Sequence, residues 1–170
     1  MYTLHGEDPE LTAKIEELRA LALLDGIQFD TAPFGGVRTE ADTVRILKYR
    51  DDDYAKYEAA CAAQSPPRAP TEKALWRPIA PFGLSMHNYG AARDVKIVKK
   101  PDSFSEAEAL RRLGSLAPQC RLRWGGTFQK KIDPPHFQLP ITLSAANARW
   151  TPTVIAGGRA SMILAISSRL

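Results

Sequence analysis

The chain has 170 residues, with 23 Lys and Arg against 19 Asp and Glu, 44% hydrophobic residues and two cysteines. These values fit one compact domain with an ordinary core and exclude a disordered or fibrous chain. The charge is uneven, because residues 1–64 carry 7 basic and 13 acidic groups whereas residues 65–170 carry 16 basic and 6 acidic groups. The excess of basic groups in residues 65–170 favours an acidic partner, which could be nucleic acid, a membrane surface or another anionic polymer.

The two cysteines and the chain ends exclude several further classes. Cys61 and Cys120 lie far apart with no third cysteine near either, so we expect buried free thiols and no thiolate zinc motif or disulfide framework. The first ten residues lack a basic stretch followed by an apolar run, so we expect no cleaved secretory signal. Apolar runs such as residues 162–166 are too short to span a bilayer. The sequence therefore predicts a chain that is made in the cytoplasm and has no transmembrane segment.

A helix, a strand and a second helical region are predicted in the first part of the chain. Asp8 and Pro9 can cap and start the first helix, and Gly26 can end it. Its apolar residues recur at spacings of three and four, and a strand is expected to follow at residues 27–32. The second helical region is expected from about Thr39 to Gln64, with Asp42 as the capping-box partner of Thr39. We expect the acidic run 51–53 to break it into two helices.

The rest of the chain predicts short strands around one further helix. Three prolines in residues 65–70 indicate an exposed loop inserted within the domain. The expected elements that follow are a strand from residue 91, a helix opened by Ser105 with Glu108, a short strand at 120–124, a turn at Gly125-Gly126 and an extended segment at 136–139. This order predicts an α+β fold with an antiparallel sheet, in one domain over residues 1–170. Whether the extension 141–170 completes the core or packs on a neighbour is left open.

Two of the three histidines lie in segments dense in Gly, Asp and aromatic residues. Neutral imidazoles with one or two carboxylates form a ligand set that suits catalytic zinc, which keeps one position open. A turn at Gly90 would let the segments before and after it present His87 and Asp94 to one point, and His136 would complete the set from a neighbouring strand. Two prolines stiffen the loop that carries Asp133 and would hold this residue near the metal. There it can take a proton from zinc-bound water and pass it to a leaving amine.

The same residues carry a resemblance to a known family. Residues 85–94 fit the pattern Ser-x-His-x-x-Gly-x-Ala-x-Asp, and the segment resembles zinc D-alanyl-D-alanine carboxypeptidases and L-alanyl-D-glutamate endopeptidases, which include phage endolysins. Trp124-Gly125-Gly126 with Asp133-x-x-His136-Phe137 is similar to the second signature of that family. Gly36-Val37-Arg38-Thr39 resembles a further family segment, in which the arginine faces the substrate. The resemblance covers about residues 27–140.

The resemblance implies a fold and a set of roles. The fold would be the compact α+β domain shared by Hedgehog signalling domains and D,D-peptidases, with a small antiparallel sheet and flanking helices. One Zn²⁺ would bind His87, Asp94 and His136, with Asp133 as the base. Arg38 would hold a substrate carboxylate or the developing oxyanion. We read Ser85 as a hydrogen-bonding group at the substrate and Trp124 as either a core residue or a wall of the substrate groove.

The function predicted from these residues is hydrolysis of an amide bond in the stem peptides of peptidoglycan. Asp rather than Glu in the base position, together with the lack of a secretion signal, favours an L-alanyl-D-glutamate endopeptidase of the endolysin type. Two alternatives stay open: removal of terminal D-alanine, and a non-catalytic, zinc-stabilised module that binds the cell wall or a protein. Nucleic-acid binding has only the charge in its favour.

The distribution of charge also predicts which polymer the protein binds. Residues 93–131 hold 10 basic and 4 acidic residues, which favours attachment to anionic cell-wall polymers over DNA. The protein would reach the wall after release through a membrane lesion, or as part of a phage particle or injection device.

Overall fold

The computed structural model describes residues 7–33, 35–72, 79–80, 83–129, 131–151 and 163–164. Its elements in chain order are α1 (Pro9–Leu24), β1 (Gln28–Thr31), α2 (Glu40–Ala62), η1 (Met86–Tyr89), β2 (Ala92–Lys99), α3 (Glu106–Leu116), η2 (Ala117–Cys120), β3 (Arg123–Trp124), η3 (Gly125–Thr127), β4 (His136–Gln138), α4 (Leu143–Arg149), β5 (Trp150–Thr151) and β6 (Ile163–Leu164). The main sheet has the order β1-β2-β4-β3, and all its pairs are antiparallel. The predicted α+β class is confirmed.

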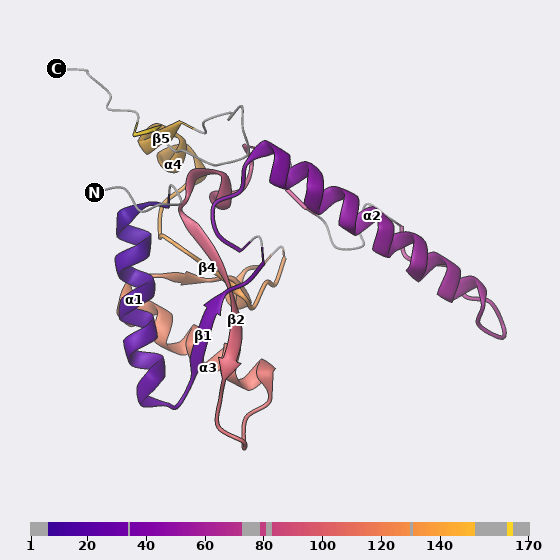
Figure 1. Cartoon of the computed structure of the whole chain (residues 1–170), viewed down its shortest axis with the longest axis horizontal. Helices are drawn as coiled ribbons and strands as arrows, with labels where there is room; N and C mark the ends of the chain where they lie inside the picture. The colour runs from indigo at the N-terminus through magenta and orange to yellow at the C-terminus, as the bar shows by residue number, and fades with distance from the viewer. Residues whose placement is uncertain are drawn as a thin grey trace.

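Helix α1 packs along the sheet and supplies one side of the core (Figure 1). It begins as predicted, with the Asp8 side chain accepting a hydrogen bond of 2.9 Å from Glu10 N and Pro9 in the first position. Gly26 follows the helix at φ +70°, a conformation that favours glycine. The buried residues Leu11, Ile15, Leu18 and Ala22 recur on one helix face and join the core. Helix α3 packs beside α1 and begins at the predicted Ser105–Glu108 capping box.

Helix α2 runs unbroken over 23 residues and extends away from the rest of the molecule (Figure 1). It begins at the predicted capping box, in which Thr39 Oγ1 accepts from Asp42 N at 3.0 Å. The prediction that the acidic run 51–53 breaks the helix is wrong. The Arg50 guanidinium binds Asp51 Oδ1 at 2.8 and 3.0 Å, which offsets part of the repulsion within the run, and exposed charges are screened by water and salt.

The segment after α2 returns alongside the helix. The Tyr54 hydroxyl donates to Thr71 O at 2.8 Å, and Arg68 N donates to Cys61 O at 3.1 Å. Residues 65–69 are exposed, as predicted for the proline-rich loop. Cys61 and Cys120 are buried free thiols, which confirms that prediction.

Strand β3 is shorter than expected. Cys120 ends η2, and Arg121 adopts φ +56°, so the backbone is turned there and becomes extended only from Arg123. The hydrogen bond from Leu122 N to Ala117 O, 2.9 Å long, closes this turn. The prediction that the strand begins at residue 120 is therefore wrong by three residues.

The first part of the C-terminal extension belongs to the core. Ala146 of α4 is fully buried within the core cluster, and α4 contacts η1. The extension thus completes the core over α4, while residues 152–162 and 165–170 lie outside the described residues. Within the described ranges, no helix is both long and apolar enough to cross a bilayer.

Candidate metal centre

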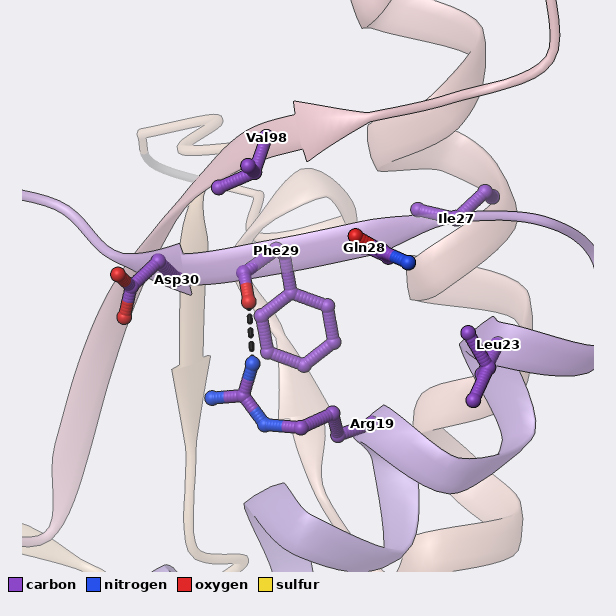
Figure 2. Close-up of a pocket in the computed structure, with 7 residues that line it drawn as sticks. All are labelled: Arg19, Leu23, Ile27, Gln28, Phe29, Asp30 and Val98. Carbon is purple, nitrogen blue, oxygen red and sulfur yellow. Dashed lines mark hydrogen bonds between the residues drawn. The ribbon is translucent and has the colours of Figure 1, made fainter.

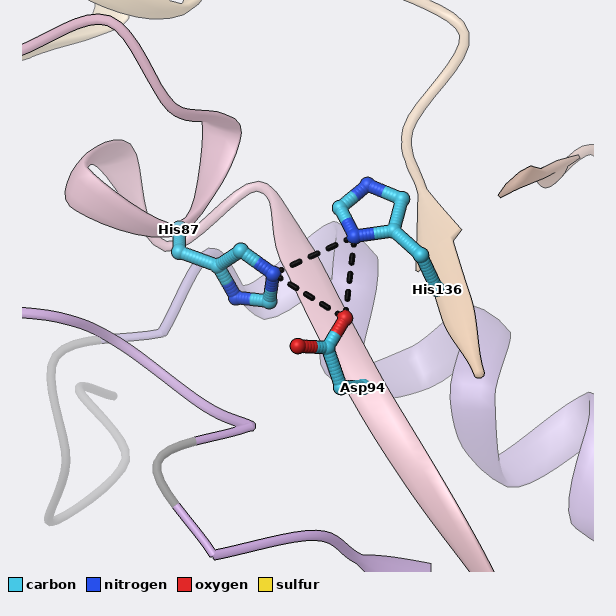
Figure 3. A group of neighbouring side chains, drawn as sticks. All are labelled: His87, Asp94 and His136. Atoms are coloured by element: carbon cyan, nitrogen blue, oxygen red, sulfur yellow. Dashed lines mark hydrogen bonds and ion pairs between the residues drawn. The ribbon is translucent and has the colours of Figure 1, made fainter. Parts of the chain in front are cut away.

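Side-chain atoms of His87, Asp94 and His136 converge on one point (Figure 3). Asp94 Oδ1 lies 2.9 Å from His136 Nδ1 and 3.1 Å from His87 Nε2, and the two ring nitrogens lie 3.2 Å apart. Both histidines are buried, and the Asp94 side chain is 18% exposed. In the described part of the chain, these three residues form the one cluster of this kind. The structure thus brings together the three residues predicted from the sequence as zinc ligands.

His87 is presented by η1, the short helical turn before β2. The Ser85 hydroxyl caps this turn by accepting from His87 N at 3.4 Å, and Gly90 ends it at φ +63°. Gly90 therefore makes the sharp turn that the sequence predicted between the first two ligands. The Ser85 hydroxyl thus hydrogen-bonds the backbone of η1, while its role at the substrate stays a prediction.

Asp94 and His136 are directly opposed residues of the antiparallel pair β2–β4. Side chains that face each other across such a pair lie on the same side of the sheet with their Cβ atoms about 4.5–5.5 Å apart. The register therefore brings the carboxylate and the imidazole into contact without a special loop. Figure 3 shows Asp94 rising from β2 and His136 from β4 toward the same point.

The loop between β1 and α2 supports two of the three residues from outside. Gly36 O lies 3.0 Å from His87 Nδ1, and the Arg38 guanidinium hydrogen-bonds Asp94 Oδ2. At Gly35 the backbone approaches so closely that a Cβ there would lie 2.5 Å from Asp94 O, which explains the glycine. Arg38, predicted to face the substrate, therefore lies at the edge of the cluster and holds the second oxygen of Asp94.

The hydrogen-bond partners determine where each imidazole carries its proton. A carbonyl oxygen only accepts, so His87 Nδ1 donates to Gly36 O, and a neutral His87 has a lone pair at Nε2. His136 Nε2 lies 3.0 Å from Gln138 Oε1, which accepts in the same way and leaves a lone pair at Nδ1. Two nitrogen lone pairs and a carboxylate oxygen then face one another at close range. These electron-rich atoms repel one another, and a bound cation would remove that repulsion.

The donor set fits zinc. Zn–N and Zn–O bonds of about 2.0–2.2 Å in a tetrahedron place the donors roughly 3.3–3.6 Å apart, slightly wider than the separations of 2.9–3.2 Å in this cluster. Three protein ligands with a fourth position open is the arrangement of catalytic rather than structural zinc sites.

The environment sets the charge of the cluster. Burial lowers the pKa of His87 and outweighs the neighbouring Asp94 carboxylate, so this ring is neutral near pH 7 and free to bind a metal. For Asp94, burial acts to raise the pKa, but hydrogen bonds with the rings of His136 and His87 outweigh it and hold that pKa well below 3.8. Asp94 is thus ionised near neutral pH.

The loop that carries Asp133 is fixed through its main chain. Asp133 N donates to Gly125 O at 2.9 Å, and Asp133 O accepts from His136 N at 3.0 Å. A Cβ at Gly125 would lie 2.3 Å from Asp133 O, so only glycine allows this close approach. These contacts fix the main chain of Asp133 just before His136. The role of Asp133 as a base stays a prediction.

Trp124 braces the same loop from the other side. Its indole Nε1 donates to Pro134 O at 2.7 Å. Its ring lies so close to Gly114 and Gly126 that a Cβ at either position would stand 2.2 Å from a ring atom. The half-buried indole is thus packed between α3 and η3, which favours the core interpretation over the groove wall.

Three supporting groups were not predicted from the sequence: the Gly36 carbonyl, Asn88 and Gln138. Asn88 is buried, accepts from Gly83 N at 3.0 Å and donates to Arg38 O at 2.9 Å, so it ties η1 to the Arg38 loop. For Gln138 a signal was present, because a residue two positions after a strand ligand points to the same side. The contact between the Gly36 carbonyl and His87 depends on the path of the backbone, which no residue pattern indicated.

A pocket of about 420 Å³ lies elsewhere, at the open edge of the sheet between α1 and β1 (Figure 2). Arg19 Nη1 hydrogen-bonds Phe29 O, and the guanidinium lies 4.8 Å from the centre of the Phe29 ring. The pocket has no predicted site residue in its lining, which consists of Arg19, Leu23, Ile27, Gln28, Phe29, Asp30 and Val98. It offers no nucleophile and no metal-ligand set.

Residues 80–139, which contain all three converging residues and Asp133, match the protein family described as D-alanyl-D-alanine carboxypeptidase. The match covers 60 of the 170 residues of the chain. The match supports the family resemblance predicted from the sequence, and with it the predicted class of enzyme, a zinc metallopeptidase acting on peptidoglycan. No curated protein matches the chain.

Several solved structures share the fold of this chain. One is the vancomycin resistance D,D-pentapeptidase VanY from a VanB-type cassette, a mutant in complex with Zn(II), with 21% identity, a TM-score of 0.57, and coverage of 86% of this chain and 80% of that one. VanYB in complex with D-alanine-D-alanine matches at 22% identity and a TM-score of 0.55, over 83% and 75% of the two chains. The LdcB LD-carboxypeptidase matches at 18% identity and a TM-score of 0.53, over 82% and 74%. They confirm the predicted fold of the D,D-peptidase type.

Proposed function

We propose that His87, Asp94 and His136 bind one Zn²⁺ and that the protein hydrolyses an amide bond in the stem peptides of peptidoglycan. The observation that carries this proposal is the convergence of two imidazole lone pairs and an ionised carboxylate, with donor separations of 2.9–3.2 Å. A zinc ion held there would supply a Lewis acid that polarises the scissile carbonyl and makes water more acidic. The other steps fall to residues of the chain.

Asp133 is the proposed general base and acid. Its loop is anchored to Gly125 through the main chain and leads directly into β4, three residues before His136. In this role it takes a proton from the attacking water and returns it to the leaving amine.

Arg38 is proposed to act at the same edge of the cluster. Its hydrogen bond to Asp94 Oδ2 leaves Oδ1 directed toward the two histidines. A guanidinium has five donors, so the same group can hold Asp94 and also face a substrate carboxylate or the developing oxyanion. Arg38 would thus link ligand orientation to substrate binding.

Two solved structures with this fold support the substrate class. VanYB was solved with D-alanine-D-alanine, and the LdcB structure is described as revealing how peptidoglycan is recognised. Within this class we propose an L-alanyl-D-glutamate endopeptidase of the endolysin type, because an Asp occupies the base position. The matched family and the VanYB ligand favour a second candidate, a D-alanyl-D-alanine carboxypeptidase.

Incubation of the purified, zinc-loaded protein with defined muropeptides tests the proposal. Mass spectrometry of the products distinguishes the two activities, because an endopeptidase creates a new D-glutamate amino terminus whereas a carboxypeptidase releases single D-alanine. Muropeptides that stay intact while zinc is bound would exclude both activities and leave the alternative of a non-catalytic binding module.

We further propose that the basic surface attaches the protein to anionic wall polymers. Arg93 and Arg112 are paired with Glu7 and Asp25, but Lys96, Lys99, Arg121 and Arg123 are exposed. Co-sedimentation with cell walls before and after removal of their anionic polymers tests this attachment. Retention on DNA at about 150 mM salt would instead favour a nucleic-acid partner. Action at the wall after release, or from a phage particle or injection device, is part of the same proposal.

A further inference from the structure

Gln138 lies two residues after His136 on β4, and its side chain faces the ring of that histidine. Oε1 of Gln138 is 3.0 Å from His136 Nε2, and both residues are only 8% exposed. The other ring nitrogen, Nδ1, faces Asp94 and His87, so the two nitrogens of His136 point in different directions (Figure 3). One side chain thus contacts the ring on the side away from the converging donors.

The backbone around Gln138 is held on both sides. Strand β4 lies between β2 and β3, and Gln138 is paired with Ala92 on one neighbour and Arg123 on the other. A residue in the middle of a sheet has little freedom to shift. The position of the amide relative to His136 is therefore fixed by the same strand that carries the ligand.

The chemistry of the contact selects one form of His136. An amide oxygen accepts hydrogen bonds but does not donate, so it fixes the proton at Nε2 and leaves the Nδ1 lone pair for a metal. Groups that bind the second nitrogen of a ligating histidine orient the ring and raise its basicity. For His87 this partner is the Gly36 carbonyl, which no side-chain substitution removes. For His136 it is a side chain and can be changed.

We propose that Gln138 is a positioning residue that fixes the tautomer and orientation of His136 and thereby strengthens zinc binding. The inference rests on the proposed zinc site at His87, Asp94 and His136. Because Gln138 contacts the far side of the ring, its effect is on metal affinity and not on the substrate.

Two substitutions separate the hydrogen bond from the packing. Gln138→Met keeps a similar volume but removes the acceptor, and Gln138→Glu keeps an acceptor that cannot donate. Gln119→Met, at an exposed position of η2, is the matched control. Zinc affinity is measured by competition with a chromophoric chelator in the full-length protein. We expect Gln138→Met to bind zinc about 10–100-fold more weakly than the wild type, with Gln138→Glu and Gln119→Met within a few-fold of it.

The outcomes distinguish this inference from the function on which it rests. Wild-type affinity in Gln138→Met would overturn the role of Gln138 while leaving the zinc site intact. A wild-type protein that binds no zinc would overturn the zinc site itself.

A second measurement uses the wild-type chain and does not depend on how the Met variant folds. In the zinc-loaded, ¹⁵N-labelled protein, we expect the His136 Nε2 proton to be observed and protected from exchange with water by its bond to Gln138. In Gln138→Glu this proton should shift further downfield, because a carboxylate is the stronger acceptor. A rapidly exchanging Nε2 proton in the wild type would contradict the inference.

Discussion

Asp94 Oδ1 and His136 Nδ1 lie 2.9 Å apart because their residues are direct partners across β2 and β4. A shift of one residue in this register would turn one of the side chains to the other face of the sheet. The geometry of the proposed zinc site is thus a property of the strand pairing, and the surrounding residues refine it.

Asp133→Ala should abolish most turnover while leaving zinc binding intact. Loss of a positioned base typically lowers the rate by about 10²–10⁴-fold, and Asp133 is not one of the three converging residues. Release of new amino termini from muropeptides measures turnover, and zinc content per chain is measured on the same sample. Asp102→Ala, an exposed position in the turn before α3, is the control. Equal activity in Asp133→Ala and the wild type would remove Asp133 from the mechanism.

Trp124→Phe should lower both stability and turnover without loss of zinc. The substitution leaves the Pro134 carbonyl without the donor that now lies 2.7 Å away, and an unsatisfied polar group costs about 1–3 kcal/mol. The loop between Asp133 and His136 would then be less well held. Urea unfolding gives the change in free energy, and a chelator titration gives the zinc affinity. A stable variant with unchanged turnover would show that this hydrogen bond does not position the loop.

Arg93→Met should be strongly destabilising although Arg93 lies outside the proposed site. Arg93 Nε donates to Glu7 Oε1 at 3.0 Å, and its Nη2 binds Glu7 Oε2, while the two side chains are only 12% and 7% exposed. Removing one member of a buried pair leaves the other charge unpaired and costs about 3–5 kcal/mol. Chemical unfolding measures the loss, with Arg111→Met as an exposed control on α3. A cost below about 1 kcal/mol would mean that water reaches Glu7.

The exposed pair Arg112–Asp25 should contribute little, and its contribution should depend on pH. The hydrogen bond from Arg112 lowers the pKa of Asp25 below its ordinary 3.8. A lowered pKa in the folded state means that the pair stabilises the protein above pH 3.8 and that this stabilisation is lost as the pH falls through the folded value. We expect Arg112→Gln to lower the stability only slightly at pH 7, because exposed ion pairs contribute little. The difference from wild type should vanish in acid, and a difference that grows in acid would contradict the assignment.

Much of the local structure could be predicted because its signals lie within a few residues. The caps at Asp8, Thr39 and Ser105 were predicted and are present. Gly90 between His87 and Asp94 predicted a turn that brings two potential ligands together, and the structure has one there. Each of these features depends on a side chain that bonds its own backbone neighbours, or on a glycine at positive φ.

The supporting contacts could not be predicted, because they depend on the path of the backbone and on strand register. The Gly36 carbonyl reaches His87 across 51 positions of the chain. The contact of Arg38 with Asp94 depends on the same loop, and the sequence pointed only to the substrate. The continuity of α2 through residues 51–53 depends on pairing with Arg50 and on solvent, neither of which the run of aspartates reveals.

A crystal structure of the zinc-loaded protein with the anomalous signal of the metal tests the central claim most directly. We predict a single zinc peak about 2.0–2.2 Å from His87 Nε2, Asp94 Oδ1 and His136 Nδ1, with a fourth position open to solvent or substrate. A zinc peak bound to other residues, or no peak at this cluster at saturating zinc, would contradict the claim.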